Sequence, residues 1–171
     1  LRCTAVPVQK NIGIIELQAF YLDFEAARRG DPDARSATAD VRKLLHELKQ
    51  ENVDGVVVDL RSNGGGSLPE AIELTGLFIK QGPVLQVRDS GGATEHYADT
   101  DSDVAWNGPL AVLVNRSSAS ASEIFAAAIQ DYGRGLIIGE PTFGKGTVQT
   151  VVDFNRYPRA KDMQLGELHM T

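Results

Sequence analysis

The stretch Leu-Ala-Val-Leu-Val-Asn-Arg-Ser-Ser-Ala-Ser-Ala-Ser-Glu-Ile-Phe-Ala-Ala-Ala-Ile, residues 110–129, holds a strand signal, a serine-rich turn and a helix signal in succession. The apolar run 110–114 is typical of a buried strand, and the apolar spacing from Ile124 to Ile129 is typical of a helix. Such a turn places backbone N–H groups and a hydroxyl at a helix N-terminus, which carries partial positive charge. It suits a serine nucleophile, although a serine that only caps the helix, Ser120 or Ser122, fits the same pattern.

A lysine between two glycines follows this unit. Lys145 lies in Pro-Thr-Phe-Gly-Lys-Gly-Thr-Val-Gln, residues 141–149, after a short apolar run at 136–139. The glycines allow the backbone to approach another segment closely. A flexible loop with a solvated lysine is the simpler interpretation of this motif alone. Combined with the serine turn, it favours a Ser–Lys dyad, in which a desolvated, neutral amine acts as general base.

A glycine-rich loop follows a second buried strand. The β-branched run 55–60 is typical of a strand covered on both faces, and Arg-Ser-Asn-Gly-Gly-Gly-Ser follows at 61–67. Ser67 is a suitable N-cap for a helix with Pro69 in its first turn. The loop could be a flexible connector, but its N–H groups could also form an oxyanion hole. It lacks the Gly-Lys-Ser/Thr ending of a phosphate-binding loop.

Strand and helix patterns alternate along the rest of the chain, which indicates an α/β domain. We expect a helix that begins at Ser36 or Thr38, since apolar residues then share one face. Polar loops are predicted at 30–33 and 155–163, and a hairpin from 82–88 with 95–98. Further strands are predicted at 11–17, 136–139, 147–154 and 165–170.

Composition excludes several classes of protein. The chain has 171 residues, 42% of them hydrophobic and 23% charged, which is ordinary for one globular domain. The net charge of −6 argues against a nucleic-acid partner, because phosphate binding needs a basic surface. No apolar run is long enough for a membrane span. The one cysteine cannot form an internal disulfide, and no Cys/His cluster has metal-ligand spacing.

Four segments together resemble the tail-specific, C-terminal processing serine peptidases of peptidase family S41, and above all their large bacterial periplasmic members. These segments are Asp-Leu-Arg-Ser-Asn-Gly-Gly-Gly-Ser-Leu (59–68), Ser-Ala-Ser-Ala-Ser-Glu-Ile-Phe-Ala-Ala-Ala (118–128), Gln-Asp-Tyr-Gly-Arg (130–134) and Gly-Glu-Pro-Thr-Phe-Gly-Lys-Gly-Thr-Val-Gln (139–149). The motifs are long and stand in the family's order, and the similarity runs from about residue 12 to the end of the sequence.

The resemblance implies a crotonase/ClpP-like layered core of strand–strand–helix units, with mixed sheets flanked by helices. It also implies that residues 1–171 are a single serine protease domain, excised from a longer protein and truncated at its C-terminus. Family members usually select substrates with a PDZ domain, which pairs a peptide as an added strand. No segment here resembles one, so we expect the PDZ domain outside this chain.

The family's roles transfer to individual positions. By resemblance Ser120 is the nucleophile, Lys145 the general base and Gln149 a residue that orients the lysine. The implied oxyanion-hole donors are backbone N–H groups of Gly65, Gly66 and Ala121. The implied supporting residues are Glu123, Thr142 and Asp131; we expect a structural role for Asp131, because a dyad needs no acid.

The expected function is a serine endopeptidase that cleaves proteins with apolar, free C-terminal tails, with no metal or cofactor, in the periplasm. Three alternatives stay open. One is an inactive, substrate-binding homologue. Another is a Ser–His hydrolase, although no Gly-x-Ser-x-Gly motif surrounds Ser120 and the three histidines lie in unremarkable contexts. The third is a crotonase-like acyl-CoA enzyme.

Overall fold

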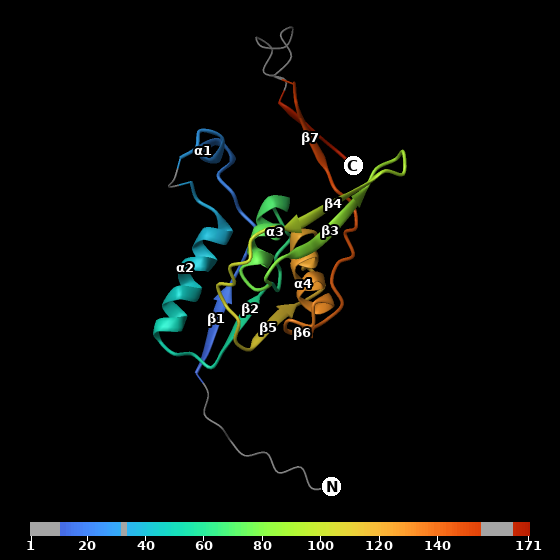
Figure 1. Cartoon of the computed structure of the whole chain (residues 1–171). Coiled ribbons are helices and arrows are strands. Elements are labelled where there is room, and N and C mark those ends of the chain that lie inside the picture. Colours follow the sequence, from blue (N-terminus) through green and yellow to red (C-terminus); the bar gives the residue numbers. More distant parts are fainter. Residues whose placement is uncertain (1–10, 32–33, 155–165) are drawn as a thin grey trace, which may run out of the picture.

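The computed structural model describes residues 11–31, 34–154 and 166–171 (Figure 1). Four parallel strands form the main sheet in the order β1 (Ile12–Glu16), β2 (Gly55–Asp59), β5 (Leu110–Val114), β6 (Leu136–Gly139). Two antiparallel strand pairs accompany it: β3 (Gly82–Arg88) with β4 (Thr94–Asp99), and β7 (Thr150–Asp153) with β8 (Glu167–Met170). The helices are α1 (Phe24–Arg28), α2 (Ala37–Gln50), α3 (Leu68–Gly76) and α4 (Ala121–Asp131).

Most predicted elements are confirmed. Helix α2 begins after Ser36, whose hydroxyl accepts the N–H of Ala39 at 3.2 Å, and Ser67 is the N-cap of α3. The strand predicted at 147–154 begins later, at Thr150, and the short helix α1 has no counterpart in the prediction. The predicted loop at 155–163, part of the loop at 30–33 and residues 1–10 lie outside the described residues.

Two strand–loop–helix units position the candidate site. Strand β2 leads through the glycine-rich loop into α3, and β5 leads through the serine turn into α4. Because β2 and β5 are parallel neighbours, their carboxyl ends lie at the same edge of the sheet, and α3 packs beside α4 (Figure 1). The two loops therefore meet, which is where parallel α/β sheets commonly bind ligands.

An aromatic cluster holds α4 in place. Phe125 is fully buried and packs edge-on against Phe78, with ring centroids 5.6 Å apart, and lies 6.4 Å from Phe20. Pairs of this geometry stabilise a core beyond the area they bury. Since Phe125 lies on the first turns of α4, this packing also fixes the N-terminus of the helix.

The prediction that strand 55–60 is covered on both faces is confirmed for one face and holds only in part for the other, where Val57 and Asp59 are half-buried. Val56 and Val58 are buried on the face that packs against the helices. On the other face, Ile14, Val57, Ala111 and Leu136 form one lateral row, and its two outer side chains, Ile14 and Leu136, are 64% and 68% exposed. The β-branched run indicates strand propensity, whereas burial of the second face of the sheet depends on which elements pack against it.

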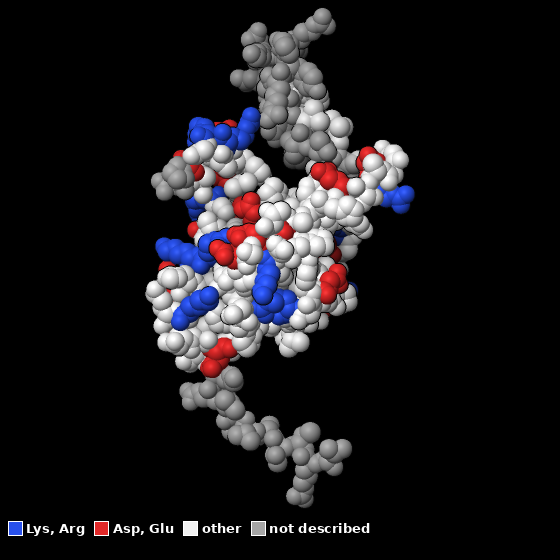
Figure 2. All heavy atoms as spheres, viewed as in Figure 1, with Lys and Arg blue, Asp and Glu red and all other residues white. Residues whose placement is uncertain are grey.

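The predicted α/β class is confirmed, with parallel and antiparallel sheets flanked by helices. No helix in the described ranges is both long and apolar enough to cross a membrane. On the face drawn in Figure 2, lysine and arginine side chains are interspersed with aspartate and glutamate rather than gathered into a continuous basic surface.

Candidate active site

Ser120 adopts a backbone conformation that is unusual for a residue with a side chain. It is the N-cap of α4, with φ 57° and ψ −117°. Non-glycine residues in such regions cost about 1–3 kcal/mol and persist only where the surroundings impose them. A strained serine between a buried strand and a helix N-terminus is also the arrangement of the nucleophile turn in α/β-hydrolases.

Two neighbours impose this conformation. The Glu123 carboxylate accepts the backbone N–H of Ser120 at 2.8 Å. From the other side, Gly65 approaches so closely that a Cβ on it would lie 2.8 Å from both the Ala119 carbonyl oxygen and the Ser120 Cβ. Gly65 also has φ +102°, so the position favours glycine twice over.

The structure separates the roles of the clustered serines. Ser118 and Ser122 are fully buried, and their hydroxyls donate to the carbonyl oxygens of Leu60 and Asn63, at 2.8 and 3.0 Å. Both connect the serine turn to the glycine-rich loop. Ser117 is exposed, whereas Ser120 is half-buried and lines a pocket.

Asn63, which sequence reasoning missed, organises the glycine-rich loop. Its side chain is completely buried, donates to the Leu17 carbonyl oxygen at 2.7 Å and accepts the Gly65 N–H at 2.8 Å. Its own carbonyl oxygen accepts the Ala119 N–H at 3.0 Å. Asparagine before three glycines resembles an ordinary turn, so the motif itself gives no sign that the side chain is buried.

The loop that carries Lys145, residues 141–149, is attached to the serine turn through Glu123. The two carboxylate oxygens accept the Thr142 hydroxyl at 2.7 Å and the backbone N–H groups of Gly144 at 2.6 Å and Lys145 at 2.9 Å. Burial raises the pKa of Glu123, but the hydrogen bonds from Thr142, Gly144, Ser120 and Lys145 outweigh it, so the pKa lies below its ordinary value. Glu123 therefore stays ionised and holds both loops together.

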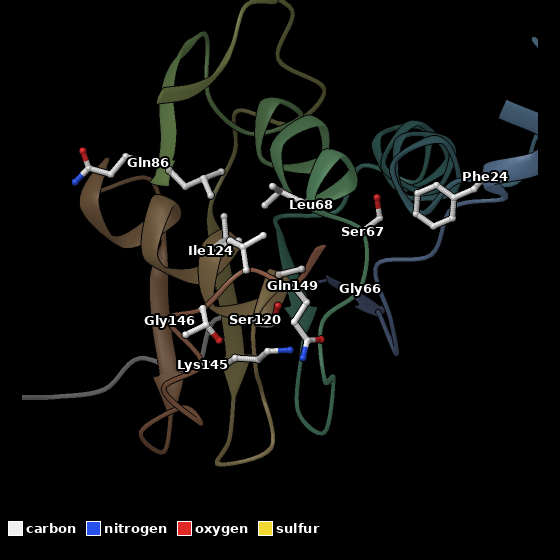
Figure 3. Close-up of a pocket in the computed structure, with 14 residues that line it drawn as sticks. Phe24, Gly66, Ser67, Leu68, Gln86, Ser120, Ile124, Lys145, Gly146 and Gln149 are labelled. Carbon is white, nitrogen blue, oxygen red and sulfur yellow. The ribbon is translucent and has the colours of Figure 1, made fainter. Parts of the chain in front are cut away.

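Ser120 and Lys145 line one pocket of about 440 Å³ (Figure 3). The Lys145 side chain is half-buried, and its amine points toward the Gln149 amide and the Ser120 side of the pocket. The lining of the pocket is mixed. Its larger apolar residues are Phe24, Leu68, Leu85, Ile124 and Val148.

The three backbone N–H groups predicted to form an oxyanion hole, those of Gly65, Gly66 and Ala121, differ in their surroundings. Gly66 and Ala121 line the pocket, and Ala121 is the first residue of α4, where a backbone N–H has no partner inside the helix. The Gly65 N–H is already donated to Asn63. Gly66 and Ala121 are thus better placed than Gly65 to donate to a ligand in the pocket.

Asp131 lies away from the dyad candidates. It ends α4, roughly 16 Å from Ser120 at about 1.5 Å per residue, and is exposed beside a second pocket of about 450 Å³. His96 lines that second pocket, and His46 on α2 pairs with Gln50 at 3.0 Å. Neither histidine lines the pocket of Ser120. Within the described residues, no group of three His, Cys, Asp or Glu side chains could hold a metal ion.

Comparisons with known proteins identify relatives along most of the chain. The family model described as Peptidase family S41 matches residues 11–164. The tail-specific protease of Haemophilus influenzae is 46% identical over 162 residues, which cover 95% of this chain and 21% of that protein. The chloroplastic carboxyl-terminal-processing peptidase 2 of Arabidopsis thaliana is 44% identical over 123 residues, covering 71% of this chain and 24% of the relative.

A solved structure of similar sequence supports the fold. The photosystem II D1 C-terminal processing protease superimposes with a TM-score of 0.69 at 38% sequence identity, over 83% of this chain and 33% of that one. The 171 residues thus span between a fifth and a third of the length of these relatives.

Proposed function

Since the chain belongs to peptidase family S41, we propose that it carries the catalytic site of a serine endopeptidase that uses a Ser120–Lys145 dyad. The observation that carries the proposal is that one carboxylate, Glu123, accepts the backbone N–H groups of both residues, and that both residues line one pocket. In this proposal the strained serine at the helix N-terminus is the nucleophile, and the lysine that lines the same pocket is its base.

The mechanism assigns each atom a task. The neutral Lys145 amine takes the Ser120 hydroxyl proton as the oxygen attacks the peptide carbonyl carbon. Backbone N–H groups of Gly66 and Ala121 donate to the oxygen that becomes negative. The Lys145 ammonium then protonates the leaving amine, and the regenerated amine activates the water that hydrolyses the acyl-enzyme. Gln149 contributes by orienting the lysine.

The substrates that we propose are polypeptides with apolar, free C-termini. The apolar side chains among those that line the pocket and the similarity to proteases named for tail-specific and C-terminal processing activity support this class. We also propose that a PDZ domain in other segments of the full-length protein selects the tail, and that the protein works in the periplasm. The compartment rests on the resemblance to periplasmic members, because the named relatives include chloroplastic as well as bacterial proteins.

The test is degradation of an unfolded reporter protein with an apolar free C-terminus by the full-length protein. Ser120→Ala and Lys145→Ala should each abolish cleavage and leave the circular dichroism spectrum unchanged. Ser117→Ala and Lys80→Ala are matched controls, because both side chains are exposed and lie outside the pocket. Cleavage that survives in Ser120→Ala or Lys145→Ala would refute the dyad.

A further inference from the structure

A segment near the start of the chain lies along the glycine-rich loop. After β1 the chain passes the start of α3 on its way to α1 (Figure 1). The Leu17 N–H donates to the Asp59 carbonyl oxygen at 3.0 Å, and the Leu17 carbonyl oxygen accepts the Asn63 side chain at 2.7 Å. Residues 17–20 are therefore attached to this loop, although Asn63 follows Leu17 by 46 positions in the sequence.

The main chain of Phe20 surrounds Gly66. The Phe20 N–H donates to the Gly65 carbonyl oxygen at 2.9 Å. The Phe20 carbonyl oxygen accepts the Ser67 N–H at 2.7 Å, which completes a parallel β-bridge between Phe20 and Gly66. A Cβ on Gly66 would lie 2.3 Å from that carbonyl oxygen, and Gly66 has φ +147°. The bridge bonds both neighbours of Gly66 and does not use the Gly66 N–H, so it fixes this group and leaves it to another acceptor.

The side chain of Phe20 connects the same point to helix α4. Its ring is buried, and the ring centroid lies 6.4 Å from that of Phe125. Phe125 follows Ala121 by about one helical turn. Gly66 and Ala121 supply the two proposed oxyanion-hole donors, and such donors act by being fixed around one oxygen before the reaction. Phe20 is thus bonded to the loop of one donor and packed against the helix of the other.

We propose that Phe20 is a positioning residue of the oxyanion hole, which fixes the Gly66 N–H relative to the Ala121 N–H. The inference rests on the proposed peptidase function. Phe20 does not line the pocket, so it acts through the two donors rather than on a substrate. A shift of about 1 Å in such a group can cost about 100-fold in rate. The loss falls on kcat rather than KM, because the negative charge on the oxygen develops only in the transition state.

Leucine substitutions in the full-length protein separate positioning from packing. Phe20→Leu removes the ring that braces residues 17–20 against α4. Phe78→Leu is the matched control, because Phe78 is equally buried and its ring lies 5.6 Å from Phe125, whereas its N–H donates to Thr75 in its own turn. Urea unfolding should show similar losses of stability. For reporter cleavage, kcat should fall about tenfold in Phe20→Leu and less than about twofold in Phe78→Leu, with KM nearly unchanged. Equal losses of kcat would overturn the proposal.

A peptide aldehyde measures the oxyanion hole directly. The Ser120 oxygen adds to the aldehyde carbon, Lys145 takes the hydroxyl proton, and the former carbonyl oxygen carries the negative charge. The aldehyde is made from the reporter residues that precede the cleaved bond, and its inhibition constant is compared with that of the matching alcohol, which forms no such bond. The preference for the aldehyde should fall about tenfold in Phe20→Leu and stay within about twofold of wild type in Phe78→Leu. A general loss of binding would weaken both compounds alike and overturn the proposal.

Phe20→Met covers a Phe20→Leu protein that does not fold, because methionine adapts its shape to gaps in a core. Its preference for the aldehyde should fall at least about threefold, and an unchanged preference would overturn the proposal. If wild type shows no preference for the aldehyde, or if Ser120→Ala still cleaves, the proposed function itself fails. If wild type prefers the aldehyde and Ser120→Ala is inactive, while the Phe20 variants keep the full preference, only this inference fails.

Discussion

The backbone N–H of Lys145 donates a 2.9 Å hydrogen bond to the Oε2 atom of Glu123, the same atom that accepts the Ser120 N–H at 2.8 Å. One carboxylate oxygen thus sets the relative position of two residues from different loops. The other oxygen accepts the Thr142 hydroxyl and the Gly144 N–H. Glu123 is therefore a positioning residue, which acts through the groups it holds rather than on a substrate.

Glu123→Gln should lower kcat about 100-fold, the scale of loss that a displacement of about 1 Å causes in a catalytic pair. Each carboxylate oxygen of Glu123 accepts two hydrogen bonds. The amide of a glutamine has only one oxygen, so its NH₂ group would face one pair of donors and could not accept from them. Steady-state kinetics should show KM nearly unchanged, because the pocket walls remain. Glu140→Gln is the control, because the Glu140 carboxylate is exposed and makes a long ion pair of 3.9 Å with the exposed Arg116. A Glu123→Gln enzyme with unchanged kcat would contradict the positioning role.

The lowered pKa of Glu123 makes part of the stability depend on pH. Its pKa is lower in the folded chain than the ordinary value of 4.5, so the ionised form stabilises the fold above pH 4.5. That contribution is lost as the pH falls through the folded pKa. The difference in Tm between wild type and Glu123→Gln should hence be largest near neutrality and shrink below pH 4.5. Thermal melts across this range measure it, and a difference independent of pH would rule the linkage out.

Gly65→Ala should lower both stability and activity. The new Cβ would lie 2.8 Å from the Ser120 Cβ, at a residue with φ +102°, so we expect the unfolding free energy to fall by about 1–3 kcal/mol. The cleavage rate should fall more than tenfold, since Ser120, the proposed nucleophile, must move. Gly64→Ala is a close control, because a Cβ there would meet no atom within 4 Å. If both variants behaved alike in urea unfolding and in cleavage, the close approach of Gly65 to Ser120 would not matter for stability or activity.

Arg134→Met should destabilise the domain by about 2–3 kcal/mol without a specific effect on the dyad. The half-buried guanidinium donates to the carbonyl oxygens of Phe78, Trp106 and Gly108 at 2.8, 2.7 and 2.9 Å. Burial lowers the pKa of Arg134, and methionine would leave these acceptors without their donor. Arg116→Met, whose side chain is 81% exposed, should change stability by less than about 0.5 kcal/mol. Urea unfolding compares the two, and similar losses would contradict the assigned role.

The sequence by itself determined the local elements and the candidate chemistry. Apolar spacing and capping residues act over a few positions, so the strand at 110–114, the Ser36 and Ser67 caps and the hairpin from 82–88 were all predictable. The proposal of Ser120 as nucleophile and Lys145 as base followed from motif and resemblance.

Only the tertiary structure decided which groups meet. Asn63 and Ser118 look like turn residues in the sequence, yet each is fully buried because β2 and β5 are neighbours in the sheet. The strain of Ser120 and the four bonds of Glu123 depend in the same way on contacts between loops far apart in the chain. Local propensity cannot encode such contacts, since they arise when parallel strands bring their carboxyl ends to one edge of the sheet.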